Sequence, residues 1–87
     1  MPKVKRYLIY STPACVYCRL LKQWLGKSGI AFEEVNVAAD PIRGQEMIQR
    51  TGQMGVPVSI ITFADGREEI VLGFNQAQLK DLLGLGT

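Results

Sequence analysis

The chain has 87 residues, of which 47% are hydrophobic and 21% charged, which suits one small domain with a modest core. Ten basic and eight acidic side chains give a net charge of +2. The sequence has no stripe of basic residues interleaved with aromatic ones, which argues against nucleic-acid binding. The N-terminus lacks the apolar stretch of a signal peptide, and the longest apolar run, 56–63, is too short to span a bilayer. We therefore expect a single cytoplasmic domain over residues 1–87, without membrane or nucleic-acid partners.

Residues 4–10 combine aromatic and branched side chains and precede a Ser-Thr-Pro turn, which predicts a strand. The next apolar positions recur at helical spacing. They predict a helix that begins at Cys15 and stops at 27–29, with Gly29 as a left-handed cap. Residues 30–37 alternate between apolar and polar side chains, which predicts a second strand. The apolar stripe of the helix consists of Tyr17, Leu20, Leu21, Trp24 and Leu25.

The middle of the chain predicts a helix followed by a hairpin. Asp40 and Pro41 open the helix, which runs towards Gly52, because aspartate caps a helix N-terminus and proline is tolerated in the first turn. Residues 56–63 form a β-rich run. An Asp-Gly pair then joins this run in a hairpin to a shorter strand over 69–72.

A last helix is predicted to open at Asn75, with Gln78 three residues on in the manner of a capping box. Its inward side consists of Leu79, Leu82 and Leu83. The predicted element order is therefore βαβ–α–ββ–α. The first unit requires a right-handed crossover between parallel strands, and the hairpin adds an antiparallel pair. This order predicts an α/β protein with the minimal thioredoxin fold, a four-stranded mixed sheet flanked by three helices.

The chain has two cysteines, Cys15 and Cys18, three residues apart at the predicted start of the first helix. Residues i and i+3 are neighbours on a helix, and a disulfide needs Cα atoms about 4.4–6.8 Å apart. Pro13 suits the start of such a helix. Because structural disulfides are rare in the cytosol, a CxxC pair beside a βαβ pattern indicates a reversible redox site.

The helix start predicts different roles for the two thiols. Thiol–disulfide exchange requires a thiolate, which free N–H groups and the positive end of a helix dipole stabilise. Cys15 should receive most of this effect, whereas Cys18, one turn inward, should be more buried and less acidic. We therefore expect Cys15 to attack a partner disulfide and Cys18 to resolve the mixed disulfide. The chain contains no histidine, which excludes a Cys–His hydrolase dyad.

Alternatives to the redox interpretation stay open. A zinc site within one chain needs about four ligands, and only carboxylates could supplement the two thiols. Two chains could instead share zinc or an iron–sulfur cluster through four thiolates, as a homodimer bridged by the CxxC pairs. A third alternative is a redox-inert interaction module in which the cysteines are a coincidental buried pair.

Three motifs, in order and at suitable separations, resemble the glutaredoxin family and its glutaredoxin-like redoxin relatives. The motifs are Tyr10-Ser11-Thr12-Pro13-Ala14-Cys15-Val16-Tyr17-Cys18, Thr51-Gly52-Gln53-Met54-Gly55-Val56-Pro57 and Leu72-Gly73-Phe74-Asn75. The resemblance implies a thiol–disulfide oxidoreductase that reduces protein disulfides or glutathione mixed disulfides, with no tightly bound cofactor. We expect a monomer, because a carrier must dock transiently.

The resemblance also assigns residues that contact the substrate. It implies that Pro57 is cis and lies beside the cysteines, leaving the Val56 backbone free to pair with an extended substrate. Gly73 is expected to allow close approach of glutathione or a partner. Tyr17 either faces solvent beside Cys15 or belongs to the core stripe. The expected substrate- or glutathione-binding residues are Thr12, Tyr17, Gly55, Val56, Pro57, Gly73, Phe74 and Asn75.

Several positions depart from the pattern of glutathione-using members. Val16 replaces the proline of their Cys-Pro-Tyr-Cys motif, Thr12 lies near the place of a lysine, and Gly55 replaces the threonine of Thr-Val-Pro. The changes at Thr12 and Gly55 remove a charge or donor that would hold the carboxylates of glutathione. The Gly-Phe pair at 73–74 instead resembles redoxins that serve ribonucleotide reductase and accept electrons from thioredoxin reductase, whereas Tyr17 is the glutaredoxin choice. The reductant, glutathione or thioredoxin reductase, therefore stays open.

Overall fold

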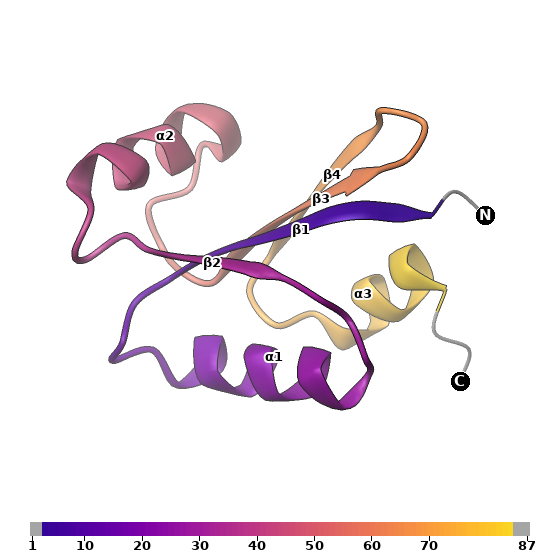
Figure 1. Ribbon diagram of the computed structural model, residues 1–87. Helices are drawn as coiled ribbons and strands as arrows, with labels where there is room; N and C mark the ends of the chain where they lie inside the picture. Colours follow the sequence, from indigo (N-terminus) through magenta and orange to yellow (C-terminus); the bar gives the residue numbers. More distant parts are fainter. Residues whose placement is uncertain (1–2, 85–87) are drawn as a thin grey trace.

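The computed structural model describes residues 3–84, which form one mixed sheet with helices on both faces (Figure 1). In chain order the elements are β1 (Val4–Ser11), α1 (Val16–Lys27), β2 (Glu33–Asn36), α2 (Pro41–Thr51), β3 (Val58–Phe63), β4 (Glu68–Leu72) and α3 (Gln76–Leu83). The strand order is β2-β1-β3-β4. β1 pairs with β2 in parallel, and the pairs β1–β3 and β3–β4 are antiparallel. The predicted minimal thioredoxin fold is confirmed.

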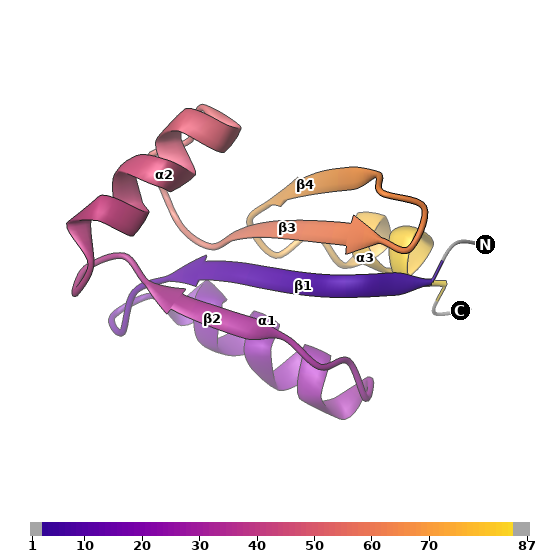
Figure 2. The same cartoon turned by 45° about the horizontal axis from the view of Figure 1, so that its top comes forward.

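The two faces of the sheet have separate cores, because successive side chains of a strand point to opposite faces. Helices α1 and α3 cover one face and α2 covers part of the other (Figure 2). The core under α1 and α3 contains Tyr7, Ile9, Leu21, Leu25, Ile61, Phe63, Val71 and Leu79. The core under α2 contains Leu8, Tyr10, Met47, Val58 and Ile60.

Two strands are shorter than the sequence predicts. The strand predicted over 30–37 is β2, Glu33–Asn36, because Ile30 and Phe32 pack against the core under α1 before the pairing with β1 begins. The strand predicted over 56–63 begins only at Val58. Proline has no N–H to donate to the sheet, so Pro57 stays outside the strand.

The predicted helix boundaries are largely confirmed. The Asp40 carboxylate accepts a hydrogen bond from the Arg43 N–H at 3.2 Å, and the Asn75 side chain accepts one from the Gln78 N–H at 3.1 Å. The capping box at Asn75 is only half formed, because the Gln78 side chain accepts from the Asn75 amide group rather than from its backbone. Gly29, with φ of 73°, takes the left-handed conformation expected after α1.

The predicted stripe of α1 is partly wrong. Leu21 and Leu25 are fully buried, but Tyr17 and Leu20 are 63% and 41% exposed. The buried stripe instead begins at Cys18, which is 1% exposed, because α1 packs on the sheet through the positions one residue after Tyr17 and Leu20. Tyr17 therefore faces solvent, which decides between its two expected placements.

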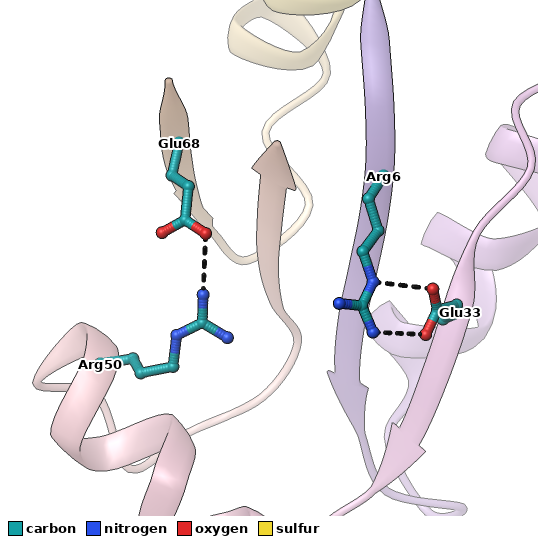
Figure 3. A network of polar contacts seen from close by, with 4 residues as sticks. All are labelled: Arg6, Glu33, Arg50 and Glu68. Atoms are coloured by element: carbon teal, nitrogen blue, oxygen red, sulfur yellow. Dashed lines mark hydrogen bonds and ion pairs between the residues drawn. The ribbon is translucent and has the colours of Figure 1, made fainter. Parts of the chain in front are cut away.

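Two ion pairs join neighbouring elements at the surface (Figure 3). Arg6 on β1 donates two hydrogen bonds to the Glu33 carboxylate on β2, each 2.8 Å long. Arg50 on α2 donates one of 3.0 Å to Glu68 on β4. Both pairs are solvent-exposed, so we expect them to contribute little to stability.

Candidate redox site

Cys15 is the N-cap residue of α1. Its backbone is extended, with φ of −84° and ψ of 114°, and its Sγ accepts a hydrogen bond from the Cys18 N–H at 3.1 Å. The loop from β1 is held by a further bond of 3.2 Å from the Cys15 N–H to the Thr12 carbonyl. The sulfur thus takes the place of a capping oxygen, where free N–H groups and the helix dipole favour negative charge.

Cys18 has a different environment. It is 1% exposed, and burial is the main cause that raises the pKa of its thiol from 9.0 to about 11, followed by a hydrogen bond with Cys15. A backbone hydrogen bond from Thr12 and the charge of Lys22 act in the opposite direction on this pKa. Cys18 is the more buried of the two thiols, as expected, since Cys15 is only partly buried. Both cysteines are free thiols.

The loop before β3 lies against Cys15. The Val56–Pro57 bond is cis, as the resemblance implied. The Cys15 thiol lies 3.8 Å from the Val56 carbonyl oxygen, to which it can donate. The Pro57 carbonyl in turn accepts a hydrogen bond of 2.9 Å from the N–H of Gly73, whose φ of 71° is left-handed. The three motifs, distant in sequence, therefore meet at one end of the sheet.

Of the remaining predicted residues, some are exposed at the surface and others pack against or cap a helix near the site. Tyr17 is exposed in the first turn of α1, and Gly55 is exposed with open space around the position of an added Cβ. Phe74 packs edge-on against Trp24 of α1, with ring centroids 5.9 Å apart. Asn75 caps α3. Phe74 and Asn75 thus have structural roles that the resemblance did not imply.

Three polar residues behind Cys18 were missed by the sequence analysis. The hydroxyl of Ser11, a residue 1% exposed at the end of β1, donates to the Glu34 carboxylate at 2.6 Å. The same carboxylate oxygen lies 2.7 Å from the Lys22 ammonium. These contacts lower the pKa of Glu34, Lys22 being the larger cause. The available signal was the position of Lys22, one helical turn after Cys18.

Within residues 3–84, no three histidine, cysteine, aspartate or glutamate side chains gather closely enough to hold a metal ion. None of the helices in this part of the chain combines the length and apolar character needed to cross a membrane.

The fold and the CxxC pair at a helix start define a thioredoxin-fold protein, and comparison with known proteins places it more closely. The model of the Glutaredoxin family matches residues 7–63. A glutaredoxin-like 8.6 kDa protein encoded in the rubredoxin operon of Clostridium pasteurianum is 43% identical over 75 residues, covering 86% of this chain and 93% of that protein.

Solved structures agree with this placement. The thioredoxin-like protein BC3987 is 28% identical, with a TM-score of 0.77 over 90% of this chain and 100% of that chain. The glutaredoxin-like NrdH-redoxin of Escherichia coli is 27% identical, with a TM-score of 0.71 over 88% of this chain and 93% of that chain. The chain belongs to the glutaredoxin family, whose members are thiol–disulfide oxidoreductases.

Proposed function

We propose that the protein reduces disulfides through a dithiol mechanism in which Cys15 is the nucleophile and Cys18 the resolving thiol. The observation that supports this most is the contrast between the two sulfurs. Cys15 Sγ is partly exposed at the N-cap of α1 and accepts a backbone N–H, whereas Cys18 is buried one turn further on. Cys15 Sγ therefore lies where a partner disulfide can reach it, next to the free N–H groups of a helix N-terminus.

The reaction proceeds in two exchanges. The Cys15 thiolate attacks one sulfur of the substrate disulfide, a Cys15–substrate disulfide forms, and the other substrate sulfur leaves as a thiolate that takes up a proton. Cys18 then loses its proton and attacks Cys15 Sγ. The Cys15–Cys18 bond forms, the bond to the substrate breaks, and the substrate has gained two electrons.

The substrate segment that we propose is extended and lies along the loop before β3. Val56 precedes the strand and is not paired within the sheet, and its carbonyl lies 3.8 Å from Cys15 Sγ. A backbone N–H next to a substrate cysteine could donate to this carbonyl, which would align the scissile disulfide with the nucleophile. Tyr17 and Val16, both more than half exposed, would flank it.

We propose thioredoxin reductase rather than glutathione as the electron source. Glutathione binding requires cations or donors for its carboxylates. Thr12 carries no charge near the place where glutathione-using members have a lysine, and Gly55 has no side-chain donor where they have a threonine. The similar NrdH-redoxin of Escherichia coli is described by a thioredoxin-like activity profile. Disulfide-containing proteins would then be the substrates.

Two cysteine variants test the assigned roles. Cys15→Ser should abolish disulfide reduction, and Cys18→Ser should accumulate a mixed disulfide with the substrate, detected by intact mass. Dithiol reductase activity that survives in Cys15→Ser would reverse the roles.

A coupled assay identifies the reductant. NADPH oxidation in the presence of a protein disulfide is compared with thioredoxin reductase and with glutathione plus its reductase. Turnover with thioredoxin reductase alone is the expected result, and turnover with the glutathione system alone would contradict the proposed electron source.

A further inference from the structure

We propose that Lys22, held in place by Glu34 and Ser11, promotes the resolving step by stabilising the thiolate of Cys18. This inference rests on the proposed dithiol function and adds a positioning group to it. It starts from a requirement of the mechanism: Cys18 must lose its proton while it is 1% exposed. A buried thiolate is unfavourable unless a donor or a positive charge compensates for the lost water.

Lys22 is the cation that α1 places beside Cys18. The two residues are four apart on the same helix, so their side chains are neighbours on one face. The ammonium is not free to swing into solvent, because its Nζ lies 2.7 Å from Glu34 on β2 and the Lys22 side chain is only 34% exposed. The charge of Lys22 accordingly favours ionisation of Cys18.

Glu34, which holds Lys22 by an ion pair, is itself bound by a residue at the end of β1, the strand before α1. Ser11 is buried at the end of β1 and donates to Glu34 at 2.6 Å. The backbone of the next residue, Thr12, lowers the pKa of the Cys18 thiol, and its carbonyl accepts the Cys15 N–H at 3.2 Å. The Ser11–Thr12 dipeptide therefore contacts Glu34 through Ser11 and the N-terminus of α1 through Thr12.

Two charges act on the pKa of Cys18: the ionised Cys15 sulfur raises it, and Lys22 on α1 lowers it. Glu34 on β2 is the ion-pair partner of Lys22. The negative charge of Glu34 would disfavour a thiolate nearby. Lys22 offsets that charge by an ion pair, and the Ser11 hydroxyl donates a hydrogen bond to the same carboxylate oxygen. Lys22 lies on the same helix face as Cys18, and its charge lowers the pKa of the Cys18 thiol. Cys15 is neutral in charge during resolution, since its sulfur is then part of the mixed disulfide.

The effect on the reaction is confined to the second exchange. Lys22 favours loss of the Cys18 proton to solvent, and the thiolate then attacks Cys15 Sγ and expels the substrate thiolate, which is reprotonated. A rise of one unit in the pKa of Cys18 lowers its thiolate fraction tenfold, but the more basic thiolate is about threefold more nucleophilic. The net expected loss of rate is about threefold for each such unit.

The test resolves the two exchanges by stopped flow. Reduced protein is mixed with dithiobis(nitrobenzoic acid), an aromatic disulfide that releases one coloured thiolate when Cys15 attacks and a second when Cys18 resolves. Lys22→Met should slow the second phase at neutral pH, by about threefold for each unit by which the pKa of Cys18 rises, and leave the first phase unchanged. Lys22→Arg keeps the charge and should restore the second phase. Lys27→Met, on the same helix but more than two turns from Cys18, is the matched control.

A double variant separates this effect from a general structural one. If Glu34 acts through Lys22, then Lys22→Met/Glu34→Gln should resolve no more slowly than Lys22→Met. A second phase that is unchanged in Lys22→Met, or equally slow in Lys22→Arg, would overturn the role of the Lys22 charge. Release of a single thiolate by the wild-type protein would instead contradict the proposed dithiol function, so the two failures are distinguishable.

Discussion

The two faces of the sheet differ in how completely they are covered. Side chains from β1, β3 and β4 are buried in the core under α1 and α3, whereas α2 lies over one end of its face and the β3–β4 hairpin extends past it (Figure 2). Ile70 and Leu72, which alternate with the buried Val71, are 39% and 49% exposed on that side. The helix that carries the redox pair, α1, has three buried side chains, whereas α2 and α3 have one each.

Truncation of the α1 stripe should have the largest effect. Leu21 is fully buried, and Leu21→Ala should lower the free energy of unfolding by about 3 kcal/mol because it removes apolar contacts and leaves a cavity. The matched control is Leu20→Ala, on the same helix, where the side chain is 41% exposed and the loss should be well under half as large. Urea unfolding of both variants checks the difference, and equal losses would contradict the assigned face of α1.

Alkaline pH should lower the free energy of unfolding through Tyr7, which lies in the core under α1 and α3. Burial raises the pKa of Tyr7 from 10.0 to about 12, against a smaller opposing effect of its hydrogen bond with Ser59. The folded protein thus holds the phenol proton more tightly than the unfolded chain does. The resulting stability is complete below pH 10.0 and is lost as the pH rises towards about 12. The loss should reach about 2 kcal/mol, and Tyr7→Phe should not show it in urea unfolding across this range. An identical pH dependence in that variant would exclude Tyr7 as the cause.

Two tyrosines of β1, one on each face, should show the smallest effects on stability and compare the two faces most directly. Tyr7 donates to the buried hydroxyl of Ser59 at 2.8 Å, whereas Tyr10 donates to Glu46 at 2.7 Å, a carboxylate that Arg43 also contacts at the surface. Tyr7→Phe should cost about 1 kcal/mol at neutral pH, because Ser59 loses its buried partner. Tyr10→Phe should cost less, since water and Arg43 still satisfy Glu46. A larger loss for Tyr10→Phe would reverse the ranking.

The sequence predicted the element order because each element carries a local signal. Asp40 with Pro41, and Asn75, are caps whose side chains bond the first helical turn as expected. The exposure of Tyr17 could not be decided from the same kind of evidence. Its spacing fits an apolar stripe, and a shift of one residue in how a helix sits on the sheet exchanges Tyr17 for Cys18.

The site was predictable only in part for a similar reason. The local CxxC spacing indicates the two sulfurs, and the resemblance supplied Pro57. The Lys22–Glu34–Ser11 contacts join three elements, so they depend on the register of β2 beside β1 and on the rotation of α1. The residues that neighbour Cys18 in the sequence determine neither the register of β2 nor the rotation of α1. All of the expected substrate-contacting residues stay predictions in that role: Thr12, Tyr17, Gly55, Val56, Pro57, Gly73, Phe74 and Asn75.

Competitive alkylation of the reduced protein tests the central claim, the division of roles between an exposed and a buried thiol, most directly. A limiting amount of iodoacetamide is added at neutral pH, and the labelled cysteine is identified by peptide mass mapping. The label should appear first on Cys15 Sγ, while Cys18, which is 1% exposed and has its pKa raised to about 11, stays unmodified. Equal labelling of both cysteines, or earlier labelling of Cys18, would contradict the account.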